Sequence, residues 1–135
     1  MKIKKLNNIN KKSLGFTLIE LMITVAIVGV LASIAYPSYT AFVTQSNRTE
    51  GQRALLRFAN LQEQYFVDYR TYGNLMVLGK ASTTVHYDTS IAALDLTATT
   101  FIIKATAKNS QANNDAACSP LTINEVGQKG PAGCW

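Results

Sequence analysis

The chain begins with a polar, lysine-rich segment and then turns apolar from Phe16 to Tyr36, a run in which Glu20 is the single charged residue. Apolar residues lie on every side of a helix built from this run, which is typical of a membrane span. At about 1.5 Å per residue, the run is long enough to cross a hydrocarbon core of roughly 30 Å. We therefore expect residues 16–36 to form a transmembrane helix.

After Pro37 the apolar positions recur every three or four residues, which predicts an amphipathic helix. We expect one helix from about Thr17 to Tyr69, with its first half in lipid and its second half apolar on one face only. Gly29 and Pro37 are the helix breakers within it, because glycine is flexible and proline lacks a backbone donor. Gly51 is expected to weaken the middle of the helix by about 1 kcal/mol. The apolar stripe of the second half consists of Ala54, Leu55, Phe58, Leu61, Gln62, Tyr65 and Tyr69.

Further along the chain, apolar and polar residues alternate, as they do in strands with one buried face. The first alternation covers residues 84–91 and the second covers residues 101–108. Residues 121–124 predict a third strand, with a short return over residues 128–130, whereas residues 109–115 are polar and are expected to form a loop. The residues expected to face the core in the two alternating runs are Val85, Tyr87, Thr89 and Ile91, and then Phe101, Ile103, Ala105 and Ala107.

A sheet of this kind needs a cover for its apolar face, and the stripe on the second half of the helix is the candidate. The pattern therefore predicts the α+β class, with a long N-terminal helix packed on an antiparallel sheet of three or four strands. We expect three regions: a basic leader over residues 1–15, the transmembrane helix over residues 16–36, and a globular domain over residues 37–135. The second half of the helix belongs to this globular domain.

Two cysteines, Cys118 and Cys134, lie near the C-terminus. Positive charges before a membrane helix favour cytoplasmic retention, so the residues after the helix are expected outside, where disulfides persist. The spacing is not that of a CxxC pair, and His86 as the only histidine does not complete a structural zinc site. We expect a Cys118–Cys134 disulfide that closes the C-terminal loop, with two buried free thiols as the alternative. Trp135 is expected to pack over this cystine, with a contact to a neighbouring subunit as its alternative role.

The net charge of +5 is a property of the leader, because five of the 13 Lys and Arg residues precede Gly15. The remaining basic residues are matched in number by the 8 Asp and Glu residues. A neutral chain beyond the leader gives no support to a broad nucleic-acid surface. A local basic patch around Arg48, Arg53 and Arg57 is the alternative.

Three interpretations fit the N-terminus. A secretory signal peptide explains the lysines, the apolar run and the small residues near Ala35, but it leaves Glu20 unexplained. A plain membrane anchor also leaves Glu20 unexplained, because an unpaired carboxylate in hydrocarbon costs on the order of several kcal/mol. The third is a precursor cleaved between Gly15 and Phe16, in which the new amine of Phe16 supplies a cation for Glu20.

The segment Gly15-Phe16-Thr17-Leu18-Ile19-Glu20-Leu21-Met22 favours the third interpretation. It resembles the processing motif of type IV prepilins and type II secretion pseudopilins. The resemblance implies a prepilin peptidase that cuts between Gly15 and Phe16 and methylates the Phe16 amine. It also implies that Glu20 of one subunit faces the Phe16 amine of a neighbour in the filament, and that the segment between Gly29 and Pro37 can unwind there.

A second resemblance lies near the C-terminus, to PilE-like minor pilins. It is carried by Asp115-Ala116-Ala117-Cys118, Leu121-Thr122-Ile123-Asn124, Gly127 and the closing Cys134-Trp135, and Tyr69-Arg70-Thr71-Tyr72 fits the same subgroup.

Together these resemblances imply a structural minor subunit of a type IV pilus, or fimbrium, that supports pilus assembly and hence cell adhesion, twitching motility or DNA uptake. The implied partners are the prepilin peptidase, the other subunits of a hetero-oligomeric filament, and the inner membrane before assembly. The precursor would span that membrane once with a periplasmic C-terminus, and the assembled subunit would lie in the extracellular pilus. The alternatives are a type II secretion pseudopilin and a DNA-binding minor pilin for transformation, although the net charge does not support nucleic acid as a partner.

The sequence contains no convincing catalytic set. His86 is expected to be a solvent-facing strand residue, although Asp88 two positions on leaves a pH-sensing or ligand role as the alternative. No Ser-His-Asp set, Cys-His pair or glycine-rich phosphate loop can be assembled. We therefore expect neither an enzyme activity nor a metal or cofactor.

Overall fold

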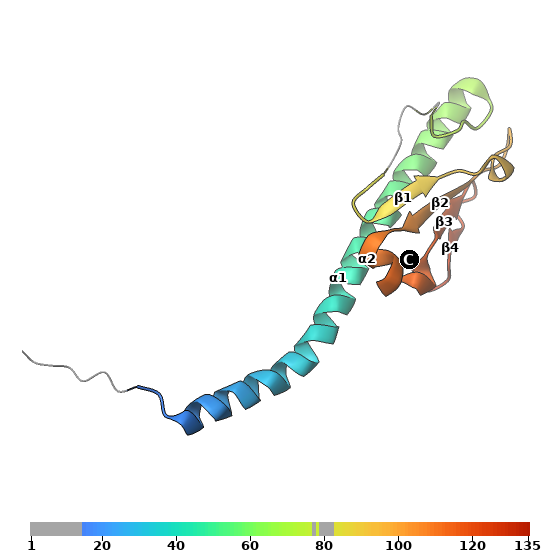
Figure 1. Cartoon of the computed structure of the whole chain (residues 1–135). Helices are drawn as coiled ribbons and strands as arrows, with labels where there is room; N and C mark the ends of the chain where they lie inside the picture. The colour runs from blue at the N-terminus through green and yellow to red at the C-terminus, as the bar shows by residue number, and fades with distance from the viewer. Residues whose placement is uncertain (1–14, 77, 79–82) are drawn as a thin grey trace, which may run out of the picture. The chain divides into compact units, whose positions relative to one another are not determined.

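The computed structural model describes residues 15–76, 78 and 83–135 (Figure 1). The chain forms two compact units, an N-terminal unit over Met1–Pro37 and a globular unit over Ser38–Trp135. The five lysines of the leader lie outside the described residues, as do residues 77 and 79–82.

Helix α1 runs from Leu18 to Tyr69, which confirms the single long helix that the apolar pattern predicts. It continues through both Gly29 and Pro37. A proline within a helix removes only its own N–H donor and disturbs the preceding turn, so neighbouring hydrogen bonds can carry the helix past it. The helix ends where Arg70 adopts a left-handed backbone conformation, with φ at 57°.

The globular unit contains a four-stranded sheet in the order β1-β2-β3-β4, and every pair of neighbours is antiparallel. The strands are β1 (Tyr87–Ser90), β2 (Ile102–Ala107), β3 (Leu121–Asn124) and β4 (Lys129–Gly130). Figure 1 shows the strands side by side, with the second half of α1 along one face of the sheet. The predicted α+β class and its type of sheet are thereby confirmed.

The core of the globular unit lies between α1 and this sheet. Leu55 and Phe58 of α1 belong to one buried cluster with Tyr87, Ile103 and Leu121 of the strands. Fully burying a side chain of this size contributes roughly 1.5–3 kcal/mol. The expected inward-facing residues of β2 and its entry are all buried, namely Phe101, Ile103, Ala105 and Ala107.

Gly51 lies where the backbone of α1 comes close to side chains of the sheet. A Cβ atom at this position would lie 3.0 Å from the Tyr87 ring and 3.2 Å from Cδ1 of Leu121. Glycine lowers the helix propensity here, but its missing side chain permits the close contact between α1 and β1. The sequence indicated the cost of Gly51 but not the reason for it.

Two segments differ from the prediction. The region expected to be a loop contains helix α2 (Asn109–Asn114) and the 3-10 helix η2 (Ala116–Cys118), so the loop prediction over residues 109–115 is wrong. Apolar periodicity does not reveal α2, because its one buried residue is the polar Gln111. Val85 is exposed instead of facing the core, since β1 begins only at Tyr87. Another short 3-10 helix, η1 (Ala93–Asp95), lies between β1 and β2.

Cys118 and Cys134 form a disulfide with their Cα atoms 5.6 Å apart, which confirms the expected bridge. Both cysteines belong to the buried core cluster, and Trp135 packs against that cluster. The indole Nε1–H of Trp135 donates to the carbonyl of Gly130 at 2.9 Å. The Gln52 amide of α1 donates to the carbonyl of Cys134 at 3.0 Å, so the C-terminal loop is attached to the helix as well as to the sheet.

Replacing Gly51 with valine should destabilise the globular unit by about 1–3 kcal/mol, because the added carbons would press on Tyr87 and Leu121. Urea unfolding of the globular unit, followed by circular dichroism, measures this loss. Gln64→Val introduces the same side chain at an exposed position of α1 and should change stability by less than about 1 kcal/mol. Equal losses in the two variants would contradict the close-approach explanation.

Candidate functional site

The expected processing motif lies at the start of α1. Gly15 and Phe16 are exposed immediately before the helix. The Oγ1 atom of Thr17 accepts a hydrogen bond from the backbone N–H of Glu20 at 3.3 Å, so Thr17 caps the helix. A threonine followed three residues later by glutamate is the capping-box pattern, and a carboxylate in the first turn also suits the positive end of the helix dipole. Sequence reasoning missed this local role of Glu20.

Helix α1 is long and apolar enough to cross a membrane, a test of length and composition that the signal sequence of a soluble protein also passes. Its large apolar side chains between Phe16 and Tyr36 are exposed in the isolated chain. An exposed apolar surface of this extent requires lipid or protein around it.

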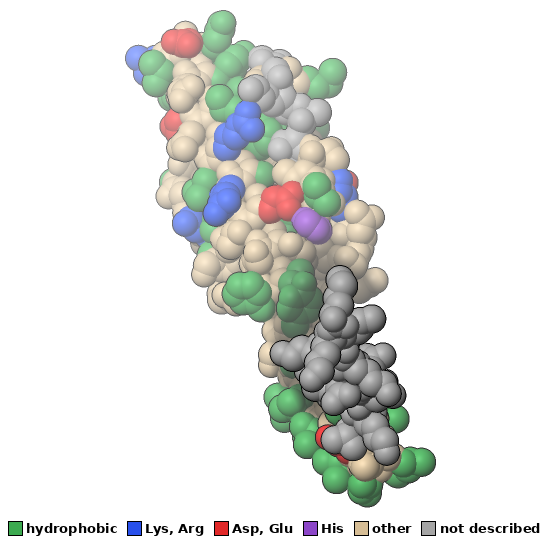
Figure 2. Space-filling model, turned by 90° about the vertical axis from the view of Figure 1, so that its left-hand side faces the viewer, with side chains coloured by type: hydrophobic (Ala, Val, Ile, Leu, Met, Phe, Trp, Pro, Cys, Tyr) green, Lys and Arg blue, Asp and Glu red, His purple; other side chains and the backbone are tan. Residues whose placement is uncertain are grey.

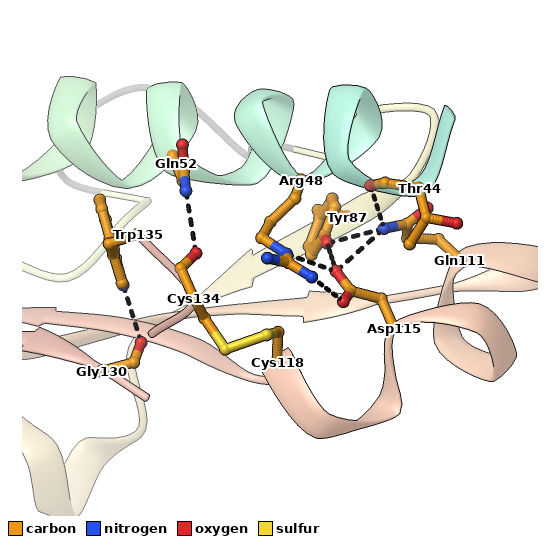
Figure 3. The surroundings of a disulfide bond; sticks show 10 residues. All are labelled: Thr44, Arg48, Gln52, Tyr87, Gln111, Asp115, Cys118, Gly130, Cys134 and Trp135. Carbon is orange, nitrogen blue, oxygen red and sulfur yellow. Dashed lines mark hydrogen bonds and ion pairs between the residues drawn. A yellow bond between two sulfur atoms is a disulfide. The ribbon is translucent and has the colours of Figure 1, made fainter. Parts of the chain in front are cut away.

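A buried polar network joins α1 to the segment formed by α2 and η2 (Figure 3). The guanidinium of Arg48 makes two hydrogen bonds to the Asp115 carboxylate, one of them from Nε to Oδ2 at 2.9 Å. The Tyr87 hydroxyl and the Gln111 amide each donate to the same Oδ2 atom at 3.1 Å. The Gln111 amide also donates to the carbonyl of Thr44 at 2.9 Å. One carboxylate thus collects donors from the helix, from the sheet and from α2.

The network fixes the ionisation of its acidic members. Burial by itself raises the pKa of the Asp115 carboxyl, whose side chain is only 3% exposed. The hydrogen bonds from Arg48 and Tyr87 outweigh this effect, so the pKa of Asp115 lies below its ordinary value. Burial, together with the hydrogen bond to Asp115, raises the pKa of Tyr87 to about 12. At neutral pH the carboxylate is therefore charged and the phenol is protonated.

This network neutralises one residue of the predicted basic patch. Arg48 is paired with Asp115, whereas Arg53 and Arg57 of that patch have no ion pair among the described residues. Two lysines of the globular unit are also paired. The Nζ atom of Lys104 lies 2.7 Å from Asp95, and that of Lys108 lies 3.0 Å from Asp88.

Several cations remain without an ion pair among the described residues of the globular unit: Arg53, Arg57, Arg70 and Lys129. Arg53 and Arg57 are exposed one turn apart on α1. Figure 2 shows Lys and Arg side chains on the same face of this unit as the single histidine. Ion pairing therefore leaves exposed positive charge on a domain whose overall charge is close to neutral.

Lys129 lies near the same part of the helix. It lines a shallow hollow with Leu56 and Asn60, which are on the turns of α1 that carry the two exposed arginines. Its Nζ atom also lies 4.8 Å from the centre of the Trp135 ring, in a cation–π arrangement. Glu63 lines the hollow as well, and its carboxylate accepts a hydrogen bond from a neighbouring tyrosine hydroxyl.

His86 is not the solvent-facing strand residue that was expected. It precedes β1, is half-buried, and its Nδ1 atom lies 2.6 Å from Oε2 of Glu50 on α1. Burial raises the pKa of Glu50, but hydrogen bonds from Thr84 and His86 outweigh it and lower that pKa overall. The partners of this pair, like those of the Arg48–Asp115 pair, are far apart in the sequence, so no local pattern identifies either one.

The N-terminal motif and the pilin-like fold place the chain in a known class. Residues 10–36 match the family model described as "Prokaryotic N-terminal methylation motif". Residues 37–122 match the model described as "Type IV minor pilin ComP, DNA uptake sequence receptor", and because this match covers more than half of the chain, the chain belongs to that family of type IV minor pilins. The resemblance to type IV pilins is confirmed by this family match, and the fold is that of a type IV pilin.

Curated relatives match mainly through part of their length. The type IV major pilin protein PilA of Myxococcus xanthus (strain DK1622) is 37% identical over 70 residues, which are 52% of this chain and 32% of PilA. The type IV major fimbrial protein FimA of Dichelobacter nodosus is 57% identical over 37 residues, or 27% of this chain and 23% of FimA. The chain therefore spans a third or less of the length of these relatives.

Two solved structures share the fold. A type IV pilin from Shewanella oneidensis superimposes with a TM-score of 0.56 at 23% identity, covering 68% of this chain and 97% of that one. The non-core minor pilin PilV of Neisseria meningitidis gives a TM-score of 0.52 at 16% identity, covering 66% of this chain and 86% of PilV. At these identities the similarity shows the fold alone.

Replacing Arg48 with methionine should destabilise the globular unit by about 3–5 kcal/mol, because Asp115 would stay buried without its cation. Lys104→Met removes a more exposed pair and should cost less than about 1 kcal/mol. Urea unfolding of the globular unit of each variant at neutral pH makes the comparison. Similar losses of stability in the two variants would mean that burial does not make the Arg48–Asp115 pair more important than the Lys104–Asp95 pair.

The pKa of Asp115 also predicts how stability depends on pH. Since this pKa is lower in the folded state than the ordinary value of about 3.9, the stabilisation is complete above that value and is lost as the pH falls through the folded pKa. Urea midpoints measured between pH about 7 and 2 should therefore fall more steeply in the wild type than in Asp115→Asn. Parallel pH profiles would show that Asp115 does not contribute.

Proposed function

We propose that this minor pilin binds DNA and acts as a receptor during DNA uptake. The observation that carries the proposal is the match of residues 37–122 to a family model whose description names a DNA uptake sequence receptor. The unpaired cations of the globular unit support it, because contacts from Lys and Arg to phosphates supply most of the affinity for double-stranded DNA. This reading replaces adhesion or motility as the primary role.

The exposed arginines of α1 are the groups best placed for such contacts. Arg53 and Arg57 share one side of the helix, and neither is neutralised by an ion pair in the described part of the chain. An arginine fork can donate two hydrogen bonds to one phosphate, which gives geometric specificity as well as charge. Lys129 lies beside the same turns of α1 and would extend this surface toward β4.

We expect the double variant Arg53→Gln, Arg57→Gln to weaken DNA binding and to flatten its salt dependence. Loss of two phosphate contacts should reduce the slope of log affinity against log salt by about 2. Fluorescence anisotropy with a labelled duplex and the detergent-solubilised full chain, over a series of salt concentrations, measures both quantities.

The matched control is the double variant Lys104→Gln, Lys108→Gln, which loses the same formal charge. Both lysines are already paired with carboxylates, and at physiological salt the effect of a charge extends only about 8 Å. The control should therefore bind DNA nearly as well as the wild type. If both double variants bind as the wild type does, the arginine face is not the DNA interface; if the wild type shows no salt-dependent binding, the receptor function itself is wrong.

We further propose that residues 1–15 form a leader that is removed by cleavage between Gly15 and Phe16, with methylation of the Phe16 amine. The match of residues 10–36 to the methylation motif supports this step. Residues 16–36 would then hold the precursor in the inner membrane and later enter the filament, while residues 37–135 form the globular domain. In the filament, the carboxylate of Glu20 would face the new amine of a neighbouring subunit, since each charge is costly in an apolar bundle without the other.

Glu20→Ala should be processed normally but should be incorporated poorly into pili, because the Phe16 amine of its neighbour loses a counter-charge. Immunoblots of cell membranes and of sheared surface filaments separate these two steps. Thr17→Ala is the matched control, since it removes the cap of the same helical turn and keeps the carboxylate. Wild-type amounts of the Glu20→Ala subunit in pili, or equal losses in both variants, would contradict the charge pairing.

A further inference from the structure

Two large aromatic side chains stand exposed where α1 enters the globular unit. Tyr39 is 68% exposed and Phe42 is 72% exposed, and neither belongs to the core cluster. On a helix, residues three apart lie on neighbouring positions of one side, so the two rings form a single exposed surface. Two exposed aromatic rings at a fixed place on the helix indicate a contact with lipid or protein.

The surroundings of this pair are uncharged. Residues 38–47 of α1 include no Asp, Glu, Lys or Arg. Neither ring lines the hollow that Thr44 and Arg48 form with Asn114 and Asp115, so both rings lie away from the segment of α2 and η2. The one charged pair here, Arg48–Asp115, is turned inward and neutralised.

The distance along the helix places the aromatic pair at a defined depth. The apolar run ends at Tyr36, and at about 1.5 Å per residue Tyr39 lies about 4.5 Å and Phe42 about 9 Å beyond it. The polar interface on each side of a bilayer is about 5–8 Å thick, given a hydrocarbon core of about 30 Å within a total of about 40–45 Å. The Cα atom of Tyr39 therefore falls within this layer. The Cα atom of Phe42 lies just beyond it, and its ring tilts back toward the layer because side chains on a helix point toward the N-terminus.

We propose that Tyr39 and Phe42 anchor this part of α1 in the headgroup layer of the membrane while the subunit awaits assembly. Aromatic rings favour this layer because it offers an apolar side and a wet side at once. Because residues 38–47 carry no charge, the helical turns beside the rings can approach the headgroups without desolvating an ion. The proposal rests on the membrane-spanning precursor described under the proposed function.

The test uses the full chain in phosphatidylcholine vesicles whose lipids carry bromine either near the headgroup or near the end of the acyl chain. Trp135 is first replaced by phenylalanine, and a single tryptophan is then introduced as Tyr39→Trp or Phe42→Trp. Emission from both positions should be quenched more strongly by the shallow bromine than by the deep one. Tyr69→Trp, an exposed position on the same helix but 30 residues after Tyr39, should not be quenched by either lipid.

A further variant, Ala26→Trp in the middle of the apolar run, reports on insertion itself and should be quenched by the deep bromine. If Ala26→Trp is quenched in this way while positions 39 and 42 behave like position 69, the docking surface is wrong and the spanning helix stands. Deep quenching at positions 39 and 42 would also overturn the proposal, because the rings would lie in hydrocarbon. No quenching at Ala26→Trp would overturn both the docking surface and the membrane-spanning precursor.

Discussion

The attachment of α1 to the rest of the globular unit depends on the buried carboxylate of Asp115. It binds the guanidinium of Arg48 from the helix and accepts hydrogen bonds from Tyr87 of β1 and Gln111 of α2. A buried carboxylate is stable only when its acceptor sites are filled, so the three donors must arrive together. The Asp115 carboxylate thereby fixes the positions of α1, β1 and α2 relative to one another. The apolar core packs within that arrangement.

The same helix must satisfy two different surroundings. Its first half is apolar on all sides, whereas its second half has one apolar stripe, with Leu55 and Phe58 facing the sheet and Arg53 and Arg57 facing solvent. Glycine at position 51 belongs to the second half, where the helix backbone must come close to Tyr87. The residue types along α1 thus match the surroundings of each helical turn, and the intrinsic helix propensity of the residues matters less.

Ion pairing decides which charges the globular unit presents to a partner. A count of charges gives a nearly neutral domain, but Arg48, Lys104 and Lys108 are neutralised by carboxylates while Arg53 and Arg57 are not. A nucleic-acid surface is defined by the local arrangement of uncompensated cations, and net charge is a poor guide to it. The nearly neutral composition therefore gave a misleading argument against DNA binding. The ion pairs leave Arg53 and Arg57 uncompensated, and these two arginines make DNA a candidate partner.

The sequence by itself determined the elements whose residues repeat with a period: α1 with its apolar stripe, the strands β2 and β3, and the α+β class. It also carried the N-terminal methylation motif over residues 10–36, because that motif is a local run of residues. Only the tertiary structure decided the pairs Arg48–Asp115 and His86–Glu50, the helical form of residues 109–114 and the reason for Gly51. Periodicity records which side of an element meets apolar surroundings, whereas a polar contact between distant segments leaves no repeat in the chain and exists only once the segments are packed together.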